Sequence, residues 1–377
     1  MGKVGFAVIG IGVMGSTHVQ LIHKTENCRL AAVCDINPAA FDRISPEIRA
    51  EIPCCRSAEE LWKIEGVDAV LIAVPHYAHP DLAIAAMEHG KHVIVEKPIA
   101  VHKADALRLI EAGKKHPELI KSAMFCLRTI PAFVKIKQLI TDGELGRIRR
   151  ICWIITDWFR TQHYYDSGDW RASWSGEGGG VLLNQCPHQL DLMQWFFGMP
   201  QKVRAAVKLG KYHRIEVEDE VNAYLEYADG KTANFIATTG EAPGTNRLEI
   251  AGDRGRLVWE DGHLEFRRNE VETEKYIRTS NQTLIPPPCW TCSIPVAKAD
   301  FSIHQAIIQN VASAILDGKK LIAPLEEGLN GLELGNAMLY SGLTGEEAVL
   351  PLDAGKYAAL LDSLIAASPR KSQKQNI

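Results

Sequence analysis

The sequence predicts an α/β protein with two domains: a doubly wound parallel sheet, followed by an α+β domain with a large, open, mostly antiparallel sheet. Three observations predict this fold class. Short apolar runs alternate with helix-like segments in the first third, a glycine-rich turn follows the first run, and strands rich in β-branched and aromatic residues begin after about Phe125. The length of 377 residues also suits two domains of roughly 150 residues each.

The first domain is expected over residues 1–125. Four short apolar runs have the character of buried parallel strands: Val4–Ile9, Leu30–Cys34, Ala69–Val74 and His92–Val95. The helix-like segments among them are Gly15–Lys24, Pro38–Arg49, His79–His89 and Lys103–Lys115. This alternation of strand and helix is typical of a doubly wound sheet.

The second domain is expected over residues 126–368. It begins with a helix over Pro131–Thr141 and a strand over Arg149–Asp157. Residues 203–260 contain short strands separated by turn signals, which predicts an antiparallel meander without a helix. Two further helices are expected over Ile303–Leu316 and Leu325–Leu343, and residues 369–377 are expected to form a disordered polar tail.

Composition excludes several classes of protein. With 46% hydrophobic and 23% charged residues and a net charge of −4, the chain has the composition of a soluble globular protein, and it lacks the basic excess of a nucleic-acid-binding protein. No apolar stretch approaches the roughly 20 residues that cross a bilayer, so no membrane association is expected. The N-terminus shows no secretory signal, and we therefore expect a cytoplasmic protein.

The nine cysteines are scattered, as is usual for reduced thiols. Cys289 and Cys292 form a CWTC pair, but no second pair matches it. The pattern favours structural or incidental cysteines over metal binding or redox chemistry, and no metal is expected.

A dinucleotide-binding turn is predicted immediately after the first strand. Gly10, Gly12 and Gly15 occur as GIGVMG, together with Ile11, Val13 and Met14. In a Rossmann domain the first glycine permits the tight turn, the second lets the pyrophosphate approach the backbone, and the third allows the helix to pack on the strand. Asp35, twenty residues beyond Gly15, ends the second strand, where its carboxylate can accept hydrogen bonds from the adenosine ribose.

The residues around Asp35 favour NAD over NADP as the cofactor. A carboxylate repels a 2′-phosphate, and the next residues, Ile36, Asn37 and Pro38, supply no arginine to neutralise one.

Two later motifs carry candidate catalytic residues. Glu96, Lys97 and Pro98 follow the fourth strand, at the edge of the sheet where ligands bind in open α/β folds. The segment GEGGGVLLNQCPHQLDLMQW contains Asn184, His188 and Asp191, whose spacings predict one shared helical face.

With these motifs, the sequence resembles the Gfo/Idh/MocA family of oxidoreductases, which includes glucose–fructose oxidoreductase and inositol dehydrogenase. The resemblance covers nearly the whole chain and rests on GIGVMG, AVPHYAHPDLA, EKP, GELG, GGG followed by NQCPHQLD, and IAGDRG. It implies that Lys97, Asn184 and His188 surround the nicotinamide and the reacting carbinol. Asn184 departs from the aspartate commoner in the family, although several branches have asparagine there.

The resemblance also implies further ligand-binding residues. His79 and Arg128 are expected to point toward cofactor or substrate, and Tyr340 to border the pocket. The expected cofactor-binding set beyond the turn and Asp35 comprises Ala73, Pro75, His76, His79, Glu96, Lys97 and Arg128.

Alcohol oxidation needs a base within hydrogen-bond reach of the hydroxyl as hydride leaves carbon. An amide cannot accept that proton, which leaves Lys97 and His188 as candidates. His188 is favoured as the base, with Lys97 polarising the oxygen and relaying the proton, but the roles could be exchanged. Asp191 either orients its neighbours or caps a helix.

A substrate region is expected within DWFRTQHYYDSGDWRASW, residues 157–174, because aromatic rings stack on sugars while charged groups bind hydroxyls. Its candidate residues are Arg160, Tyr164, Trp170 and Arg171, which join Lys97, Arg128, Asn184, His188 and Tyr340 in the expected substrate-binding set. A subunit interface, where the same residue types are enriched, explains this composition equally well.

The leading hypothesis is an NAD-dependent dehydrogenase acting on a ring hydroxyl of a sugar, glycoside or inositol, with C3 of a hexose as one candidate. The alternatives are an NAD-dependent glycoside-cleaving enzyme that oxidises C3 transiently, and a non-catalytic NAD-sensing protein, against which Lys97 and His188 argue. A homodimer or homotetramer is expected, because apolar alternation in Ala223–Tyr227 and Ala233–Ala237 would leave one sheet face exposed unless another subunit covered it.

Overall fold

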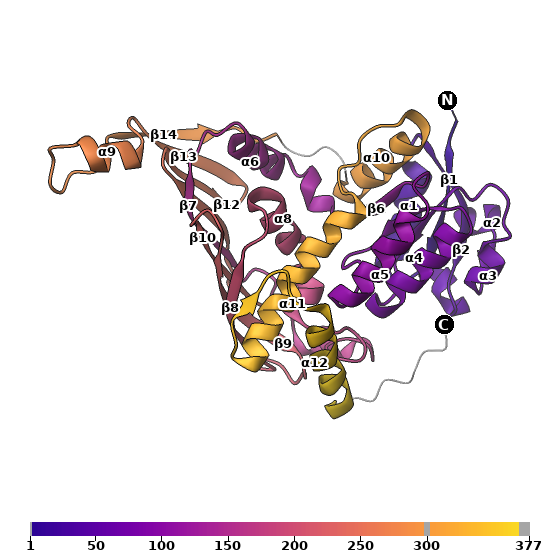
Figure 1. The fold of residues 1–377 in the computed structure, drawn as a ribbon. Helices are drawn as coiled ribbons and strands as arrows, with labels where there is room; N and C mark the ends of the chain where they lie inside the picture. Colours follow the sequence, from indigo (N-terminus) through magenta and orange to yellow (C-terminus); the bar gives the residue numbers. More distant parts are fainter. Residues whose placement is uncertain (1, 298–301, 369–377) are drawn as a thin grey trace.

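The structure, a computed structural model, describes residues 2–297 and 302–368. The polar tail expected over 369–377 lies outside these ranges. Two separate sheets stand side by side, and a layer of helices lies between them (Figure 1).

The N-terminal sheet is parallel throughout, in the order β3-β2-β1-β4-β5-β6, which confirms the doubly wound prediction. Its strands are β1 (Val4–Ile9), β2 (Cys28–Cys34), β3 (Cys54–Cys55), β4 (Ala69–Ile72), β5 (His92–Val95) and β6 (Lys121–Ala123). Its helices are α1 (Val13–Lys24), α2 (Pro46–Glu51), α3 (Ala58–Leu61), α4 (His79–Glu88) and α5 (Lys103–Lys114), with short 3₁₀ turns η1 (Pro38–Arg43) and η2 (His76–Ala78). Strands β3 and β6 were not predicted, because two or three residues show no periodicity.

The helix predicted over Pro38–Arg49 is wrong. The chain forms η1 and then α2, and it breaks at Ser45–Pro46. Proline has no N–H to continue a helix and disfavours helical geometry in the residue before it, but it is well suited to the first helical position.

The second sheet has nine strands in the order β14-β13-β12-β11-β7-β10-β9-β8-β15. They are β7 (Ile148–Ile155), β8 (Lys202–Leu209), β9 (Glu218–Glu226), β10 (Thr232–Thr238), β11 (Asn246–Gly252), β12 (Gly255–Glu260), β13 (His263–Asn269), β14 (Cys289–Ile294) and β15 (Ala348–Val349). Residues 203–260, all described, contain no helix, as predicted. The single meander is wrong, because β7 is inserted between β10 and β11 and pairs with β10 in parallel. Turn signals indicate only which consecutive strands pair, so they could not predict that β7, from much earlier in the chain, pairs with β10 and β11.

Several of the helices that follow the N-terminal domain cover one face of this second sheet (Figure 1). They are η3 (Cys126–Thr129), α6 (Pro131–Thr141), α7 (Gln162–Asp166), the π-helical turn η4 (Val181–Gln185), α8 (Pro187–Phe197), α9 (Thr273–Thr279), α10 (Ile303–Asp317), η5 (Leu325–Glu327), α11 (Gly328–Thr344) and α12 (Ala354–Ala367). Of these, α6, α8 and α11 pack on the sheet or on each other. Helix α9 belongs to the segment between β13 and β14, residues 270–288, which projects from the edge of the sheet and is called the arm.

The chain's own helices bury the apolar sheet face that was expected to need a second subunit. Trp153, Phe235, Ala223 and Leu248 are register partners on one face, and all are buried. Phe133 of α6 contacts Trp153, with ring centroids 6.2 Å apart. The prediction that the apolar face of Ala223–Tyr227 and Ala233–Ala237 is exposed in a single subunit is therefore wrong.

The last helices return to the N-terminal domain. Helix α10 packs on α1, where Asn27 donates to the Gln309 carbonyl, and α11 and α12 contact α5. We keep the division after residue 125 as a proposal: it separates the two sheets, although later helices contact both.

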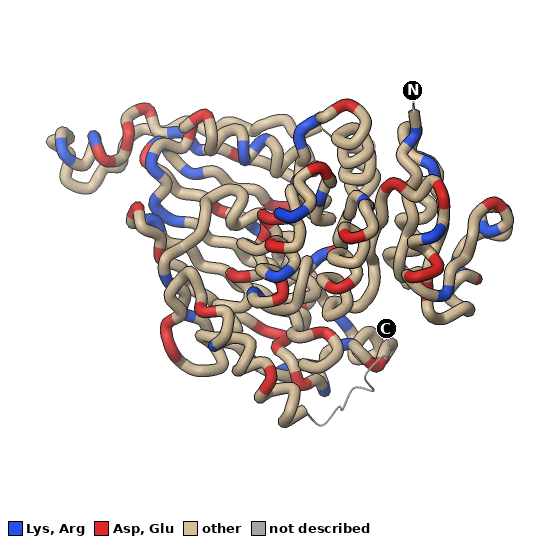
Figure 2. Tube along the Cα trace, turned by 45° about the vertical axis from the view of Figure 1, so that its right-hand side comes forward, with Lys and Arg blue, Asp and Glu red and all other residues tan. Residues whose placement is uncertain are grey.

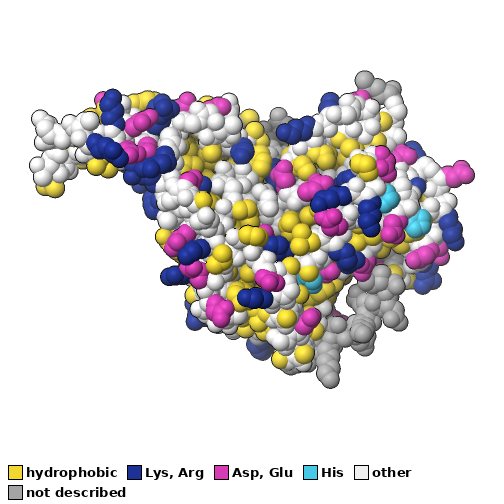
Figure 3. Space-filling model, viewed as in Figure 1, with side chains coloured by type: hydrophobic (Ala, Val, Ile, Leu, Met, Phe, Trp, Pro, Cys, Tyr) yellow, Lys and Arg dark blue, Asp and Glu magenta, His cyan; other side chains and the backbone are white. Residues whose placement is uncertain are grey.

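Charged residues of both signs are distributed along the whole trace (Figure 2). Basic side chains gather where the arm leaves the sheet (Figure 3), and arginines there are paired with carboxylates, as in Arg149–Asp253 and Arg254–Glu272. Among the described helices, none combines the length and the apolar character that crossing a membrane requires.

Candidate active site

The three glycines of the dinucleotide turn have three different surroundings. Gly10 has φ +90°, and a Cβ there would lie 2.6 Å from the Ala73 carbonyl oxygen. A Cβ on Gly15 would lie 1.8 Å from the Gly10 carbonyl oxygen, whereas one on Gly12 would meet no protein atom within 4 Å. Gly10 and Gly15 are therefore needed for packing, and Gly12 leaves the backbone open to a ligand at the start of α1.

Asp35 is fixed beside this turn. Its Oδ2 accepts a hydrogen bond of 2.7 Å from the Ile11 N–H, and its Oδ1 accepts one of 2.8 Å from the Asn37 N–H. Each oxygen retains a lone pair for a ribose hydroxyl. The open backbone at Gly12 and the placed carboxylate together fit NAD. The structure also brings in an arginine that sequence proximity did not reveal: Arg43 Nη1 donates to the Ile11 carbonyl at 3.3 Å.

Glu96 is buried and orients the start of the EKP motif. Its Oε1 lies 2.7 Å from His18 Nε2, and its Oε2 accepts from the Lys97 N–H at 3.0 Å. Burial by itself raises the pKa of Glu96, but the hydrogen bond from His18 and its charge outweigh burial and hold the pKa at about 2. Glu96 is thus an anionic support for Lys97, and its contacts are with protein groups.

Lys97 extends from the end of β5 toward the triple-glycine segment of the second domain. Its Nζ donates to the main-chain oxygen of Asn184 at 2.8 Å. Burial lowers the pKa of Lys97, and the negative charges of Glu96 and Glu177 oppose that shift. The structure thus joins Lys97 and Asn184, as predicted for the site, but through the backbone of Asn184.

His188 lies near the start of α8, in a buried position. Its Nε2 is 4.0 Å from the Sγ of Cys126, and its Nδ1 is buried without a hydrogen-bond partner. Burial, followed by the charge of Lys97, lowers the pKa of His188 to about 3. The imidazole is therefore neutral at pH 7, and its buried Nδ1 makes no hydrogen bond to a described protein group.

The single helical face predicted for Asn184, His188 and Asp191 is wrong. Asn184 lies in the π-helical turn η4, and α8 starts only at Pro187. Asn184 contacts Glu177, His188 faces Cys126, and Asp191 forms an ion pair with Arg128. The change of helical pitch before Pro187 directs the three side chains to different partners.

Two buried glutamates that the sequence analysis missed hold this segment. Glu177 accepts from the Asn184 side-chain amide through Oε1 and from the Ala172 N–H through Oε2, at 2.7 Å for the latter. Glu218 on β9 accepts from the N–H groups of Gly180 and Leu182 at 2.9 and 3.0 Å. Burial raises the pKa of Glu177 to about 8 and that of Glu218 to about 7. Of the two, only Glu177 lies within a recognisable motif, GEGGG.

Two histidines expected to bind cofactor contact protein atoms. His79 is buried, with Nδ1 2.7 Å from the Pro98 carbonyl and Nε2 2.8 Å from that of Val74, so it joins the loops after β4 and β5. His76 Nδ1 donates to the Glu177 carbonyl at 3.0 Å. Ala73 and Pro75, by contrast, are partly exposed at the carboxyl end of β4.

Arg128 and Tyr340 do not point toward the cluster. The guanidinium of Arg128 is buried and donates to both oxygens of Asp191, to Glu327 and to the Ile322 carbonyl, so each of its nitrogens has a protein acceptor. This ion pair ties η3 to α8 and settles the open role of Asp191. The Tyr340 hydroxyl donates to Glu346 at 2.9 Å, near the end of α11. The structure thus shows protein partners for both side chains, and their binding of cofactor or substrate stays a prediction.

The aromatic and arginine side chains of residues 157–174 form a cluster. The guanidinium carbons of Arg160 and Arg171 lie 4.9 and 4.5 Å from the ring centroid of Tyr164. Arg171 also stacks on Trp170 and donates to the Tyr164 hydroxyl at 2.8 Å. Gln185, next to Asn184, donates to the same hydroxyl at 3.3 Å, and Trp170 contacts His76. The cluster therefore adjoins the catalytic residues.

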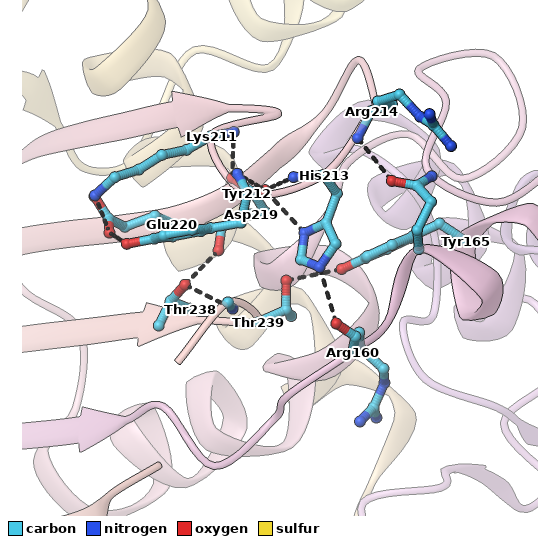
Figure 4. Close-up of polar contacts among 12 residues, drawn as sticks. Arg160, Tyr165, Lys211, Tyr212, His213, Arg214, Asp219, Glu220, Thr238 and Thr239 are labelled. Atoms are coloured by element: carbon cyan, nitrogen blue, oxygen red, sulfur yellow. Dashed lines mark hydrogen bonds and ion pairs between the residues drawn. The ribbon is translucent and has the colours of Figure 1, made fainter. Parts of the chain in front are cut away.

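A polar network anchors the backbone of Arg160 (Figure 4). Its N–H donates to Thr239, and its carbonyl oxygen is 2.9 Å from His213 Nε2. The other nitrogen of His213 is 3.0 Å from Asp219, a buried carboxylate. The guanidinium extends away from His213, and its Nε is buried without a partner. The network thus fixes the backbone of Arg160, and its guanidinium stacks on Tyr164.

Lys97, His188 and Asn184 supply an ammonium group, a neutral imidazole and an amide at the carboxyl edge of the parallel sheet. Such a set can bind and deprotonate a hydroxyl. Among the described residues, no group of three or more His, Cys, Asp or Glu is arranged to hold a metal ion. The nine cysteines are free thiols.

Comparisons with known families agree with this architecture. The model described as "Oxidoreductase family, NAD-binding Rossmann fold" matches residues 4–123, and the GFO/IDH/MocA C-terminal domain model matches residues 133–258.

Individual relatives are more distant. Inositol 2-dehydrogenase of Salmonella paratyphi B is 32% identical over 141 residues, 37% of this chain and 42% of that protein. The 2,7-anhydro-N-acetylneuraminate hydratase of Mediterraneibacter gnavus is 29% identical over 207 residues, 54% of this chain and 52% of that protein. The chain thus spans only about half of the length of these curated relatives. The crystal structure of the WlbA dehydrogenase from Chromobacterium violaceum, in complex with NADH and UDP-GlcNAcA, is similar with a TM-score of 0.80 and 25% identity over 93% of this chain and 97% of that one.

Proposed function

The chain belongs to the Gfo/Idh/MocA family of oxidoreductases, with an NAD-binding Rossmann domain, and on this premise we propose that it transfers hydride between NAD and a ring secondary alcohol of a sugar, glycoside or inositol. The observation that carries the proposal is the hydrogen bond of Lys97 to Asn184, which brings Lys97 to the segment of Asn184 and His188 at the carboxyl end of the sheet whose first turn fits NAD.

When bound, NAD supplies the hydride acceptor. The Gly10–Gly15 turn and Asp35 hold its pyrophosphate and ribose. His188 is the proposed acceptor of the hydroxyl proton, because burial lowers its pKa and leaves the imidazole unprotonated at pH 7. Lys97 donates a hydrogen bond to the same oxygen and stabilises its developing negative charge. Asn184 orients the hydroxyl.

The cluster of Arg160, Tyr164, Trp170 and Arg171 is the proposed binding surface for the remainder of the substrate. Flat ring faces of a sugar stack on Tyr164 and Trp170, and the guanidinium groups bind hydroxyl or anionic substituents. The hydrogen-bonded backbone of Arg160 supports this role, because it fixes the position from which the guanidinium extends. C3 of a hexose stays one candidate position for oxidation.

One observation favours keeping a second candidate function, a glycoside-cleaving enzyme that oxidises C3 transiently and retains NAD. The similarity to a protein named a hydratase, a class without net oxidation, extends over about half of this chain.

Both functions are tested by mixing the protein with NAD and a panel of polyols, monosaccharides and glycosides. The dehydrogenase should accumulate NADH, seen as absorbance at about 340 nm, with at least one compound. Glycoside cleavage without NADH accumulation would favour the second function. No reaction with any class would contradict both and favour an NAD-sensing protein.

A homodimer or homotetramer remains a proposal, now supported by the arm. Ile277, Leu284, Ile285 and Trp290 on and near the arm are 68, 91, 62 and 50% exposed. Large exposed apolar side chains of this kind are typical of contact surfaces where they form one patch. Light scattering at micromolar concentration should give a multiple of 41.7 kDa, and a monomer would contradict the proposal.

A further inference from the structure

Glu177 connects three segments at the candidate active site, although its carboxyl group is almost fully buried. It is 1% exposed. Its main-chain oxygen accepts from His76, its Oε2 accepts from the Ala172 N–H, and its Oε1 accepts from the side-chain amide of Asn184. Glu177 is therefore a buried carboxyl group in direct contact with a candidate catalytic residue, Asn184.

Backbone strain marks the same contact. Ala172 has φ +53°, in the left-handed region that residues other than glycine rarely adopt, and its side chain is fully buried. Such a conformation is strained and persists only where its surroundings hold it. Here it directs the Ala172 N–H at Glu177, 2.7 Å away. The fold thus keeps a strained residue in order to place this carboxylate.

The contact with Glu177 determines which way the Asn184 amide points. When Glu177 is ionised, its carboxylate accepts hydrogen bonds and donates none, so the NH₂ group of Asn184 must face it, as it does in the structure. The Oδ1 of Asn184 then faces the other way, and within the described residues it accepts no hydrogen bond from the protein. It is therefore free to accept one from a substrate hydroxyl.

We propose that Glu177 is a positioning residue, which holds the amide of Asn184 so that Oδ1 is presented to the reacting hydroxyl. The pair of Glu177 and Asn184 does the orienting work of the aspartate that is commoner in the family. An aspartate at position 184 would instead oppose two carboxylates at this contact, which is unfavourable unless they share a proton. This inference rests on the proposed dehydrogenase function.

The role of Glu177 gives turnover a distinct pH dependence. Burial raises the pKa of Glu177 to about 8, against the charges of Arg171 and Lys97, while Glu218 raises it further. His76 faces the main chain of Glu177. Below that pKa the protonated carboxyl can donate to Asn184 and turn its amide round. Turnover should therefore rise with pH as Glu177 ionises, and this limb should be absent from Glu177→Gln.

The test is a double-mutant cycle with Glu177→Gln, Asn184→Asp and the two combined, with kcat measured above pH 8, where Glu177 is ionised. Glutamine has one acceptor oxygen for two donors, the Asn184 amide and the Ala172 N–H, so the single change should lower kcat about 10-fold with a smaller change in KM. Asn184→Asp alone should lower kcat more, because it opposes two carboxylates. The combined variant again pairs an amide with a carboxylate, and its kcat should exceed the product of the single effects by about 10-fold or more.

Glu218→Gln is the matched control. Glu218 is also buried and accepts two N–H groups of the same segment, but it makes no contact with the Asn184 side chain. It should lower stability without coupling to Asn184→Asp and without removing the pH limb. Thermal unfolding and NAD titration of every variant identify any that fail to fold.

The same cycle measured on unfolding tests the contact separately from catalysis, with coupling expected between Glu177→Gln and Asn184→Asp. Two results would overturn the positioning role even if unfolding shows coupling, provided that the wild type is active. One is a kcat of the combined variant equal to the product of the two single effects, and the other is an unchanged pH limb in Glu177→Gln. Absence of turnover in the wild type with every substrate would instead refute the proposed function, and the positioning role with it.

Discussion

Two glycine-rich turns, each followed by a helix, occupy the two sides of the candidate active site, and their amides face opposite ways. In the dinucleotide turn, Gly12 is open toward the outside, and the next residue, Val13, is 72% exposed. In the triple-glycine turn, residues 178–180, the Gly180 N–H donates inward to Glu218, and a Cβ on Gly180 would lie 1.9 Å from the Glu218 carbonyl oxygen.

This difference separates ligand recognition from construction of the site. The first turn leaves a gap in the protein that a pyrophosphate can fill. The second closes on buried carboxylates and thereby fixes Asn184 and the start of α8 opposite Lys97. Changes in the first turn should therefore alter cofactor binding, whereas changes around the second should alter turnover and stability.

The largest expected effect is on turnover. Lys97→Met and His188→Ala should each lower kcat by about 10²- to 10⁴-fold, the usual contribution of a positioned acid–base group. Titration with NAD should show nearly unchanged affinity, because neither side chain is part of the dinucleotide turn.

Lys91→Met is a matched control for Lys97. Lys91 lies just before the same strand, β5, and its Nζ donates to the Val67 carbonyl at 2.8 Å, at the opposite edge of the sheet. Its kcat should stay within about twofold of the wild type. Wild-type turnover in both Lys97→Met and His188→Ala would remove these residues from the mechanism.

A matched pair of glycine substitutions tests the comparison directly. Gly180→Ala places a methyl group against backbone and should destabilise the fold by about 1–3 kcal/mol. Gly12→Ala meets no protein atom within 4 Å, and its φ of −73° suits alanine, so the free energy of unfolding should hardly change. Its NAD affinity should fall about 10-fold or more, because the methyl group occupies the ligand's space.

Denaturant unfolding and NAD titration of the two proteins measure these effects. Loss of stability in Gly12→Ala, with unchanged NAD affinity, would show that both turns serve packing.

The same difference explains what the sequence could predict. Ligand binding imposes fixed spacing on Gly10, Gly12, Gly15 and Asp35, so local pattern was sufficient for the cofactor site and for the parallel sheet. Lys97 and His188 were predicted through motifs at element ends.

The construction of the site depended on partners distant in the chain, which pattern does not specify. Glu218 contacts a turn 38 residues earlier, and β7 pairs with β10 across more than seventy residues. The ion pair of Arg128 with Asp191 was not predicted, because spacing does not identify a buried partner 63 residues away. The sheet face of Phe235 was predicted to be exposed for the same reason: the helix that covers it, α6, lies about a hundred residues away in the chain.

A third prediction concerns the pH dependence of stability, measured without cofactor. Glu177 and Glu218 have folded-state pKa values of about 8 and about 7, above the ordinary value for glutamate. Between pH 5 and 7 the folded state therefore binds more protons at these groups than the unfolded state, and stability should fall as pH rises, by up to about 1.4 kcal/mol per pH unit for each group. Glu96, with a pKa of about 2, should do the opposite at lower pH, where stability rises from about pH 2 to 4.5.

Chemical denaturation at several pH values measures this slope. Glu218→Gln should reduce it, and a slope unchanged in that variant would show that Glu218 is ionised throughout the range. A stability that rises between pH 5 and 7 in the wild type would contradict the assignment for both glutamates.

The smallest expected effect lies in the dinucleotide turn and concerns the choice between NAD and NADP. Asp35 should repel a 2′-phosphate, so the unmodified protein should bind NAD more tightly than NADP. Asp35→Ala should reduce the ratio of the two affinities about 10-fold. Arg43 makes the substitution more informative, because its guanidinium already reaches the Ile11 carbonyl beside Asp35 and could pair with the phosphate once the carboxylate is gone. Asp35→Ala combined with Arg43→Ala should therefore lose most of the NADP binding that Asp35→Ala gains, while NAD affinity changes less. Fluorescence titration of both cofactors measures the two ratios. Equal affinities for NAD and NADP in the unmodified protein would refute the charge argument, and unchanged NADP binding on removal of Arg43 would assign the gain to lost repulsion alone.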